Sequence, residues 1–302
     1  MTDRSEDNRH ALASAAVVVG TDGSEPAAIA VRWAARTASD RGRRLLIVHG
    51  IDLANTRATF DNSQIEAPSI IEAFHNRGAR LLSEAEALAR EIAPTVEIGT
   101  DLADDNPARR LIALSERAHM VVLGAAARVG PFAHLGSTLL AVTAHAHGAV
   151  VVVRGGPSPD RAPVVVGVDA GAAGEPAIEA AFAEAAVRGV DLVAVHAWSD
   201  LSSTEFAGAS YVGTPPGTLL DSERALLAER LAGWQERYPN VTVTRHVYLS
   251  GPREQLGEWS REAQLLVVGS RGRGGFRSLL LGSTSNWLVQ HADCPVMVVH
   301  AE

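Results

Sequence analysis

The sequence predicts an α/β protein made of two tandem doubly wound domains, each with a five-stranded parallel sheet. Three observations support this fold class. The length of 302 residues suits two domains of ordinary size. The segment VVVGTD at 17–22 returns as VVVGVD at 164–169, an offset of 147 residues. Short runs rich in Val alternate with longer helical patterns, which is typical of β-α-β units with helices on both faces of the sheet.

The repeat extends beyond the first strand of each copy. Arg41-Gly42 and His49 return at Arg188-Gly189 and His196 with the same offset, and LGST at 135–138 returns at 281–284. A Gly- and Pro-rich stretch at 155–159 separates the copies, and neither a helix nor a strand tolerates such a composition. We therefore predict a disordered leader over 1–14, a first domain over 15–154, a linker over 155–162 and a second domain over 163–302.

The apolar runs predict five strands per domain. In the first domain they lie near 16–20, 45–49, 96–100, 120–123 and 149–153, and in the second near 164–168, 191–196, 242–248, 265–268 and 296–300. Helical spacing predicts core-facing helices over 27–41 and 177–187. The segments 52–76 and 199–224 are too long and polar for ordinary connections, so we expect mobile lids or partner surfaces there. The last strands are expected to be sheet edges through which copies associate.

Composition excludes several classes of protein. The net charge of −8 argues against broad attraction to nucleic acid or to anionic membranes. No segment has the 18 or so consecutive apolar residues of a membrane helix. The single cysteine, Cys294, allows neither an intrachain disulfide nor a cysteine-based zinc site. We expect a cytoplasmic protein without a signal peptide.

A glycine-rich loop follows the fourth strand of the second copy. It reads GSRGRGGF over 269–276, and GSTS over 282–285 then opens a helix. Glycine lets main-chain N–H groups approach a phosphate, and a helix N-terminus offers unpaired donors and a positive dipole end. The alternative is an ordinary turn with Ser283 as a plain helix cap, and the residues alone leave both interpretations open. The spacing fits neither a Walker loop nor a dinucleotide fingerprint.

The spacing G-x2-G-x9-G-S, the CPV at 294–296 and the two first-strand motifs VVVGTDGS and VVVGVDAG resemble the ATP-binding pattern of the universal stress protein family. The histidines of the second strands and the tandem arrangement extend this resemblance over nearly the whole chain. It implies an adenine nucleotide alpha hydrolase-like sheet with strand order 3-2-1-4-5 and ATP as the ligand, with or without Mg²⁺. We further expect pseudo-symmetric pairing of the domains, with a homodimer as one possible assembly, and a regulatory protein partner that the sequence does not identify.

Carried over by position, the resemblance implies nucleotide-binding residues in both copies. In the second domain they are Gly167, Asp169, Ala197 (main chain, at the adenine), Val268, Gly269, Arg271, Gly272, Gly282, Ser283 and Thr284. The counterparts in the first domain are Gly20, Asp22, Gly50, Leu123, Gly124, Ala127, Gly136, Ser137 and Thr138. There Ala127 replaces the second glycine, and eight residues rather than nine separate it from Gly136. We therefore expect the first copy to bind weakly or not at all.

Other residues have structural interpretations. Helix N-capping is the alternative role for Asp22 and Asp169. His49 and His196 are expected to be hydrogen-bonded rather than metal ligands, and no metal site is assigned. Cys294 is expected to be a small buried residue and not a nucleophile. Four tryptophans are interpreted as packing residues, and Trp198 is expected near a bound base. The packing residues are Trp33, Trp234, Trp259 and Trp287.

Three functions follow from this reading. The first is an ATP-binding regulator of a stress response with at most slow hydrolysis. The second is a scaffold that works without nucleotide. The third is an ATP-using transferase or pyrophosphatase, which the sequence disfavours because paired carboxylates and a phosphate-binding lysine are missing. We assign no catalytic residue.

Overall fold

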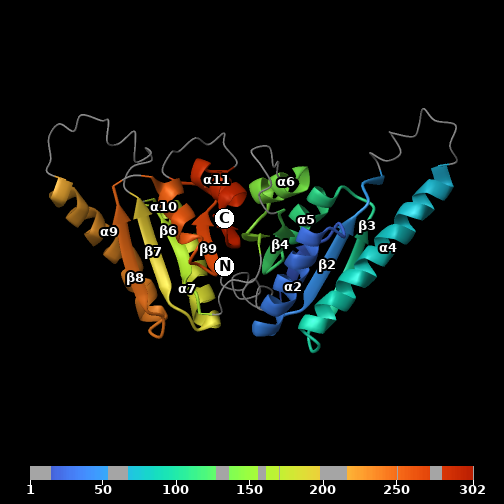
Figure 1. The fold of residues 1–302 in the computed structure, drawn as a ribbon, viewed down its shortest axis with the longest axis horizontal. Coiled ribbons are helices and arrows are strands. Elements are labelled where there is room, and N and C mark those ends of the chain that lie inside the picture. The colour runs from blue at the N-terminus through green and yellow to red at the C-terminus, as the bar shows by residue number, and fades with distance from the viewer. Residues whose placement is uncertain are drawn as a thin grey trace, which may run out of the picture. The chain divides into compact units, whose positions relative to one another are not determined.

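The protein divides into two compact units, Met1–Arg154 and Gly155–Glu302 (Figure 1). The computed structural model describes residues 15–53, 67–126, 136–155, 161–169, 171–197, 216–249, 251–272 and 281–301. The predicted leader therefore lies outside the described residues, as does most of the predicted linker. Among the described residues, no helix is long and apolar enough to cross a membrane.

The first unit is a parallel sheet with its helices in two layers. Its strands are β1 (Val17–Gly20), β2 (Leu45–Gly50), β3 (Ile98–Ala103), β4 (Met120–Gly124) and β5 (Ala149–Val153). Its helices are α2 (Glu25–Asp40), α4 (Ala67–Ile92), α5 (Pro107–Ser115) and α6 (Ser137–His145). The strand order is β3-β2-β1-β4-β5. Val17 of β1 lies beside Leu45 of β2 and beside Met120 of β4.

The second unit repeats this plan. Its strands are β6 (Val164–Val168), β7 (Leu192–Ala197), β8 (Val243–Tyr248), β9 (Leu265–Gly269) and β10 (Val296–Val299). The 3-10 turn η1 (Ala172–Gly174) precedes the helices α7 (Glu175–Arg188), α9 (Pro216–Arg237), α10 (Pro252–Trp259) and α11 (Ser283–His291). The strand order is β8-β7-β6-β9-β10, and all pairs are parallel. The predicted fold class and the order 3-2-1-4-5 are confirmed in both units.

Both faces of each sheet are covered, as the apolar strands predicted. In the first unit α2 packs beside α4 and α5 beside α6, and the two pairs lie on opposite faces. In the second unit α7 pairs with α9 and α10 with α11 in the same way. The central strands β1 and β6 are almost wholly buried. On α2, small alanines such as Ala30 and Ala34 face the sheet, which lets the helix lie close to the strands.

Two predictions about the long segments need correction. The segments 52–76 and 199–224 were expected to be mobile lids or partner surfaces, but their later parts are helical, since α4 begins at Ala67 and α9 at Pro216. The stretches 54–66 and 199–215 lie outside the described residues. Polar composition concealed the apolar stripes of these helices, which bury Leu82 on α4 and Leu227 and Leu231 on α9. A proline in the first turn does not break a helix, since no intrahelical acceptor awaits its missing N–H group.

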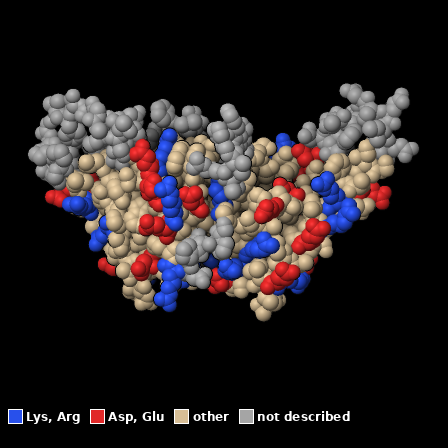
Figure 2. All heavy atoms as spheres, in the orientation of Figure 1, with Lys and Arg blue, Asp and Glu red and all other residues tan. Residues whose placement is uncertain are grey.

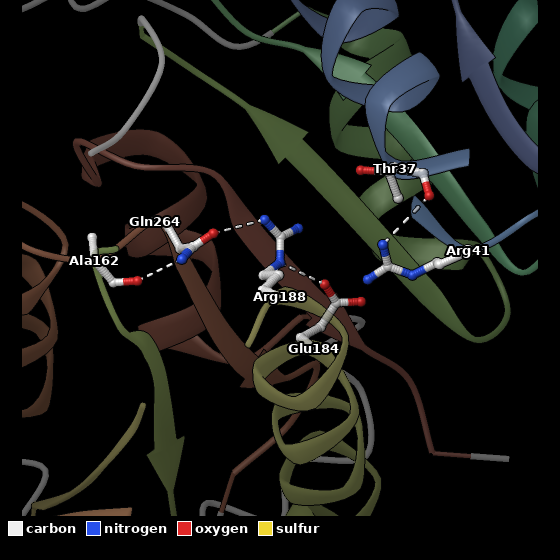
Figure 3. Close-up of polar contacts among 6 residues, drawn as sticks. All are labelled: Thr37, Arg41, Ala162, Glu184, Arg188 and Gln264. Carbon is white, nitrogen blue, oxygen red and sulfur yellow. Dashed lines mark hydrogen bonds and ion pairs between the residues drawn. The ribbon is translucent and has the colours of Figure 1, made fainter. Parts of the chain in front are cut away.

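The amino ends of the second unit's strands are held by a polar contact around Arg188 (Figure 3). Its Nε lies 3.1 Å from Oε2 of Glu184, and its guanidinium donates to Oε1 of Gln264 at 3.0 Å. Gln264 in turn donates to the carbonyl of Ala162. Glu184 is only 4% exposed, and a buried carboxylate needs such a partner. This contact thus fixes the amino ends of the strands. The predicted site lies at the opposite, carboxyl ends.

Acidic and basic side chains alternate over the described surface in Figure 2. No large area of one sign is visible on that face. The view therefore offers no basic stripe of the kind that follows a nucleic acid backbone.

Candidate functional site

The carboxyl ends of β6 and β9 bring Asp169 and Gly272 together. These two strands are neighbours at the point where the strand order reverses, which is where ligands bind in doubly wound sheets. A β-carbon placed on Gly272 would lie 3.5 Å from Oδ2 of Asp169. Asp169 is half-buried with Oδ2 enclosed, and its Oδ1 accepts a hydrogen bond from the Gly171 N–H at 3.1 Å.

Three glycines surround this carboxylate, and we call them the glycine ring: Gly171, Gly174 and Gly272. A β-carbon on Gly171 would lie 3.5 Å from Oδ1 of Asp169, and one on Gly174 only 2.7 Å from it. A side chain at Gly174 would therefore displace the carboxylate. The glycine ring lets main chain from the loops after β6 and β9 surround one acidic group without a side chain between them.

The N-terminus of α11 completes this arrangement. The Gly282 N–H donates to the Ser270 carbonyl at 2.7 Å, and the Ser285 hydroxyl donates to the Gly269 carbonyl at 2.6 Å. Gly282 is the N-cap residue, and the described residues supply no side-chain cap. The first N–H groups of α11 therefore have no acceptor within the helix and present a positive dipole end. Such an end, next to glycine main chain, fits an anion such as phosphate.

In the first unit the end of β4 lies against the first turn of α2. A β-carbon on Gly124, at the end of β4, would lie 2.1 Å from the carbonyl oxygen of Pro26 and 2.4 Å from its carbon. At Gly269, the matching residue of β9, the nearest main-chain atom before α7 is the Ala173 oxygen at 3.8 Å. The first turn of α2 thus lies closer to the end of β4 than the residues before α7 lie to the end of β9.

Other contacts near the first helix and the last helix also distinguish the two units. Ser24 caps α2 by accepting from the Ala27 N–H at 3.3 Å, whereas the described residues give α7 no side-chain cap. Asp22 is exposed, unlike the half-buried Asp169. In α6 the buried Leu139 takes the place of Ser285, so the hydroxyl contact to the preceding strand is missing there.

The equivalent residues Gly136 and Gly282 also have different surroundings in the two units. Both have the same extended main chain, with φ of −58° and −63°. A β-carbon on Gly282 would lie 3.3 Å from the Ser270 oxygen, whereas none of the described residues comes within 4 Å of one on Gly136. Ala127, predicted at the damaged position of the first loop, lies outside the described residues.

The remaining predicted residues occupy several environments. Gly20 and Gly167 lie within strands under the side chains of leucines, and Leu123 and Val268 are buried in the neighbouring strands. Gly50 packs against Pro107, whose Cα would lie 2.7 Å from an added β-carbon. Other residues fall at strand or helix ends, with Ala197 buried at the end of β7, Thr138 and Thr284 half-buried, and Arg271, Ser137 and Ser283 exposed. Ala170, Trp198 and Arg273 lie outside the described residues.

The two strand-two histidines are hydrogen-bonded, as predicted. Nδ1 of His49 lies 2.8 Å from the Thr21 carbonyl oxygen, and Nδ1 of His196 lies 2.7 Å from that of Val168. His196 also contacts Glu223 of α9, with Nε2 and Oε2 3.0 Å apart. Within the described ranges, no cluster of three or more His, Cys, Asp or Glu residues could hold a metal ion.

The capping interpretation of the two aspartates is wrong. Ser24 and Gly174, not Asp22 and Asp169, are the N-cap residues of α2 and α7. Each aspartate instead accepts from the N–H group two residues later, at 2.9 Å for Asp22 and 3.1 Å for Asp169. These are Asx turns, which aspartate forms readily at strand ends.

Sequence reasoning missed Gly174, Ser285 and Glu223. Gly174 repeats the G-x2-G spacing with Gly171, and Ser285 lies one turn after Gly282, so both had a local signal. Glu223 had none, because the segment 199–224 that contains it was predicted to be a mobile lid or a partner surface.

Several other predicted structural residues are packed as expected. Burial raises the pKa of the Cys294 thiol to about 12. Trp234 is 9% exposed and donates to Glu175 at 2.6 Å, and Trp287 stacks on His291. A pocket of about 590 Å³ lies between α7 and α9, but none of the residues that line it is a predicted nucleotide-binding residue.

Comparison with known proteins gives a consistent result. The model of the universal stress protein family matches residues 3–154 and 161–300. A universal stress protein of Mycobacterium tuberculosis is 40% identical over 295 residues, which cover 94% of this chain and 96% of the relative. One from Mycolicibacterium smegmatis is 39% identical over 294 residues, with the same coverage. A universal stress protein structure from Archaeoglobus fulgidus shares the fold, with a TM-score of 0.66, 19% identity, and coverage of 94% of this chain and 98% of that one.

Proposed function

Because the chain belongs to the universal stress protein family, with a domain of that family in each half, we propose that its second unit binds ATP and that the first unit does not. In this proposal the protein is a nucleotide-dependent regulator of a stress response that hydrolyses ATP slowly or not at all. It transmits the occupied state to a protein partner or to its own assembly.

The glycine ring around Asp169 is the observation that carries the proposal. Gly272 follows β9, Gly171 and Gly174 follow β6, and all three approach one half-buried carboxylate. A carboxylate at this position suits the hydroxyl groups of a ribose, because an ionised carboxylate accepts hydrogen bonds from both. The adjacent glycine main chain and the uncapped end of α11 suit the phosphates. The residues present therefore fit a nucleoside phosphate.

The main chain at the end of β7 is the proposed contact for the base. Ala197 ends β7, which lies directly beside β6, so it is close to Asp169 in the sheet. Its side chain is small and buried, which leaves peptide groups rather than a side chain to meet a planar ring. Main-chain contacts of this kind give adenine a defined edge to hydrogen-bond.

The described site contains no recognisable set of groups for efficient phosphoryl transfer. Asp169 is the acidic residue of the site, and its Oδ1 already accepts a hydrogen bond from the Gly171 N–H. Rapid transfer needs positioned metal ligands or cationic groups around the phosphates. We therefore propose that the site binds ATP and that its occupied or empty state is the signal. Any hydrolysis of the bound ATP is incidental to this role.

Calorimetry with Mg-ATP on the full chain tests the proposal. We expect one site per chain. Gly272→Val should abolish binding, because branched carbons would enter the space beside Oδ2 of Asp169. Asp169→Ala should weaken binding by tenfold or more, the loss expected on removing a charged hydrogen-bond partner, which is about 1.5–3 kcal/mol.

The first unit supplies matched controls. Asp22→Ala should leave the affinity unchanged. Gly282→Ala should weaken binding, since its β-carbon would lie 3.3 Å from the Ser270 oxygen, whereas the β-carbon of Gly136→Ala would meet none of the described residues within 4 Å, so this variant should not weaken it. A chain that binds no Mg-ATP at all supports instead the nucleotide-independent scaffold. A stoichiometry of two contradicts the proposed difference between the units.

A further inference from the structure

A buried polar contact links the proposed nucleotide site to helix α9. His196 is the next-to-last residue of β7, and Glu223 lies on the second turn of α9. The side chains are 2% and 18% exposed, with Nε2 and Oε2 3.0 Å apart. The other ring nitrogen, Nδ1, lies 2.7 Å from the Val168 carbonyl oxygen. One imidazole thus meets two oxygen atoms at once.

The carbonyl oxygen fixes one hydrogen on the ring. A carbonyl oxygen only accepts, so Nδ1 carries a hydrogen and donates it to Val168. Nε2 and Oε2 of Glu223, 3.0 Å apart, share a second hydrogen, which either atom can donate to the other. In both arrangements the ring and the carboxyl group satisfy each other, and the loss of either partner leaves a largely buried polar group without this hydrogen bond.

This contact reaches both sides of the proposed site. Val168, whose carbonyl accepts from the ring, directly precedes Asp169. His196 itself directly precedes Ala197, the proposed contact for the base. Val168 and His196 are also partners in the register of β6 and β7. Glu223 ties this pair of strand ends to α9, so the positions of Asp169 and Ala197 depend on one anchored side chain.

Among the described residues, the first unit has the strand contact but no carboxylate that corresponds to Glu223. His49 lies 2.8 Å from the Thr21 carbonyl, which precedes Asp22 as Val168 precedes Asp169. The helix residue over its ring is Gly78 of α4, where an added β-carbon would lie 3.0 Å from Cδ2 of His49. His49 is half-buried rather than enclosed. The chain therefore contains an internal control for the role of the carboxylate.

We infer that His196 and Glu223 are positioning residues for the nucleotide site of the second unit. They hold the main chain at Val168–Asp169 and at Ala197 in the binding geometry, and they do so without touching the ligand themselves. The inference rests on the proposed function, and it adds two residues and a helix to the site.

Calorimetry with Mg-ATP on full-length variants tests this role. His196→Ala and Glu223→Ala should each weaken binding by about tenfold, and the double variant should be no weaker than the single ones, since both residues act through one contact. Glu223→Gln should stay within about twofold of the unmutated chain. Its amide donates to Nε2 of a neutral ring, so Nδ1 still donates to Val168. His49→Ala should leave the affinity unchanged.

Two outcomes overturn the inference. One is an unchanged affinity in Glu223→Ala, with the fold verified by circular dichroism. The other is an equal loss in Glu223→Gln and Glu223→Ala, which would mean that the hydrogen-bonded geometry is irrelevant. Glu223 is the decisive position if His196→Ala fails to fold.

A second readout separates this inference from the proposed function. Amide hydrogen exchange at Asp169 and Gly171 should be faster in Glu223→Ala than in Glu223→Gln, whether or not nucleotide binds. If the unmutated chain binds no Mg-ATP, the proposed function fails and exchange still decides the positioning role. Equal exchange in both variants overturns that role.

Discussion

The two units share strand order, register and an Asx turn after the first strand, yet the first helix lies closer to the end of the fourth strand in the first unit than in the second. The difference begins with the position of the first helix. Helix α2 starts at Glu25, the third residue after Asp22, whereas α7 starts at Glu175, the sixth residue after Asp169. The 3-10 turn Ala172–Gly174 occupies the interval. A short change in where a helix begins thus decides whether main chain closes over the end of the fourth strand.

The most severe test of this comparison is a pair of alanine substitutions at the ends of β4 and β9. In Gly124→Ala the new carbon would lie 2.1 Å from the Pro26 oxygen, so α2 must move. We expect destabilisation of about 3 kcal/mol or more, at the upper end for overpacking. In Gly269→Ala the closest atom is the Arg271 oxygen at 3.2 Å, and about 1 kcal/mol is expected.

Urea unfolding midpoints of the two variants measure this difference. Far-UV circular dichroism of each purified variant controls for misfolding before the titration. Equal losses would mean that the space before α7 is as closed as the space before α2, and the comparison would fail.

The sequence predicted the features of the fold and of the site that depend on interactions between residues close together in the chain. The fold class followed from local signals, because Val-rich runs such as 164–168 and 149–153 and the repeat itself are visible without knowledge of contacts. The carboxylate at Asp169 and the glycines of the second loop were predicted from motif spacing. Their convergence is a structural observation, since Gly272 and Asp169 are more than 100 residues apart in the chain.

What the sequence did not predict depends on contacts between distant elements. The close approach of α2 to β4 brings Gly124 against Pro26, and nothing in either local sequence indicates it. Glu223 was hidden because its helix begins with a proline and follows a polar stretch. The altered loop at Ala127 predicts that the first unit binds weakly or not at all, and the close approach of α2 to Gly124 adds a separate physical reason for that prediction.

A reciprocal exchange at the first turns of α6 and α11 gives a smaller effect. Leu139→Ser should cost about 3 kcal/mol, because a buried leucine is lost from the core of the first unit. Ser285→Ala should cost about 1 kcal/mol through the lost hydrogen bond to the Gly269 carbonyl. Only Ser285→Ala should also weaken Mg-ATP binding, since that hydroxyl holds α11 to the end of β9, beside the proposed phosphate contacts. Thermal midpoints and calorimetry of both variants give the two readouts, and weaker binding in Leu139→Ser would contradict the assignment of the site to the second unit.

Alkaline pH should distinguish the units through Cys294. Burial raises the pKa of its thiol from 9.0 to about 12, so the folded state keeps a proton that the unfolded state loses. The stabilisation is complete below pH 9 and is lost as the pH rises toward 12, by about 1 kcal/mol at pH 10. In the first unit Gly148 takes this place, with φ of 65°, and cannot titrate.

Unfolding midpoints at pH 8 and pH 10 measure that loss. Cys294→Ala should remove this part of the pH dependence while leaving the contribution of other groups. The native thiol should also resist a thiol reagent at pH 8. Rapid modification of the folded protein would show that the residue is not enclosed.

The smallest expected effect concerns the cap of α2. Ser24→Ala removes the side-chain acceptor for the Ala27 N–H and should destabilise the first unit by about 1 kcal/mol, the usual value for a lost N-cap. It leaves α2 with an uncapped first turn, as the described residues leave α7. The variant should nevertheless gain no affinity for Mg-ATP in calorimetry, because the contact between Gly124 and Pro26 still fills the space. If a second binding event appeared, the cap rather than the packing of α2 would be what keeps the first unit from binding.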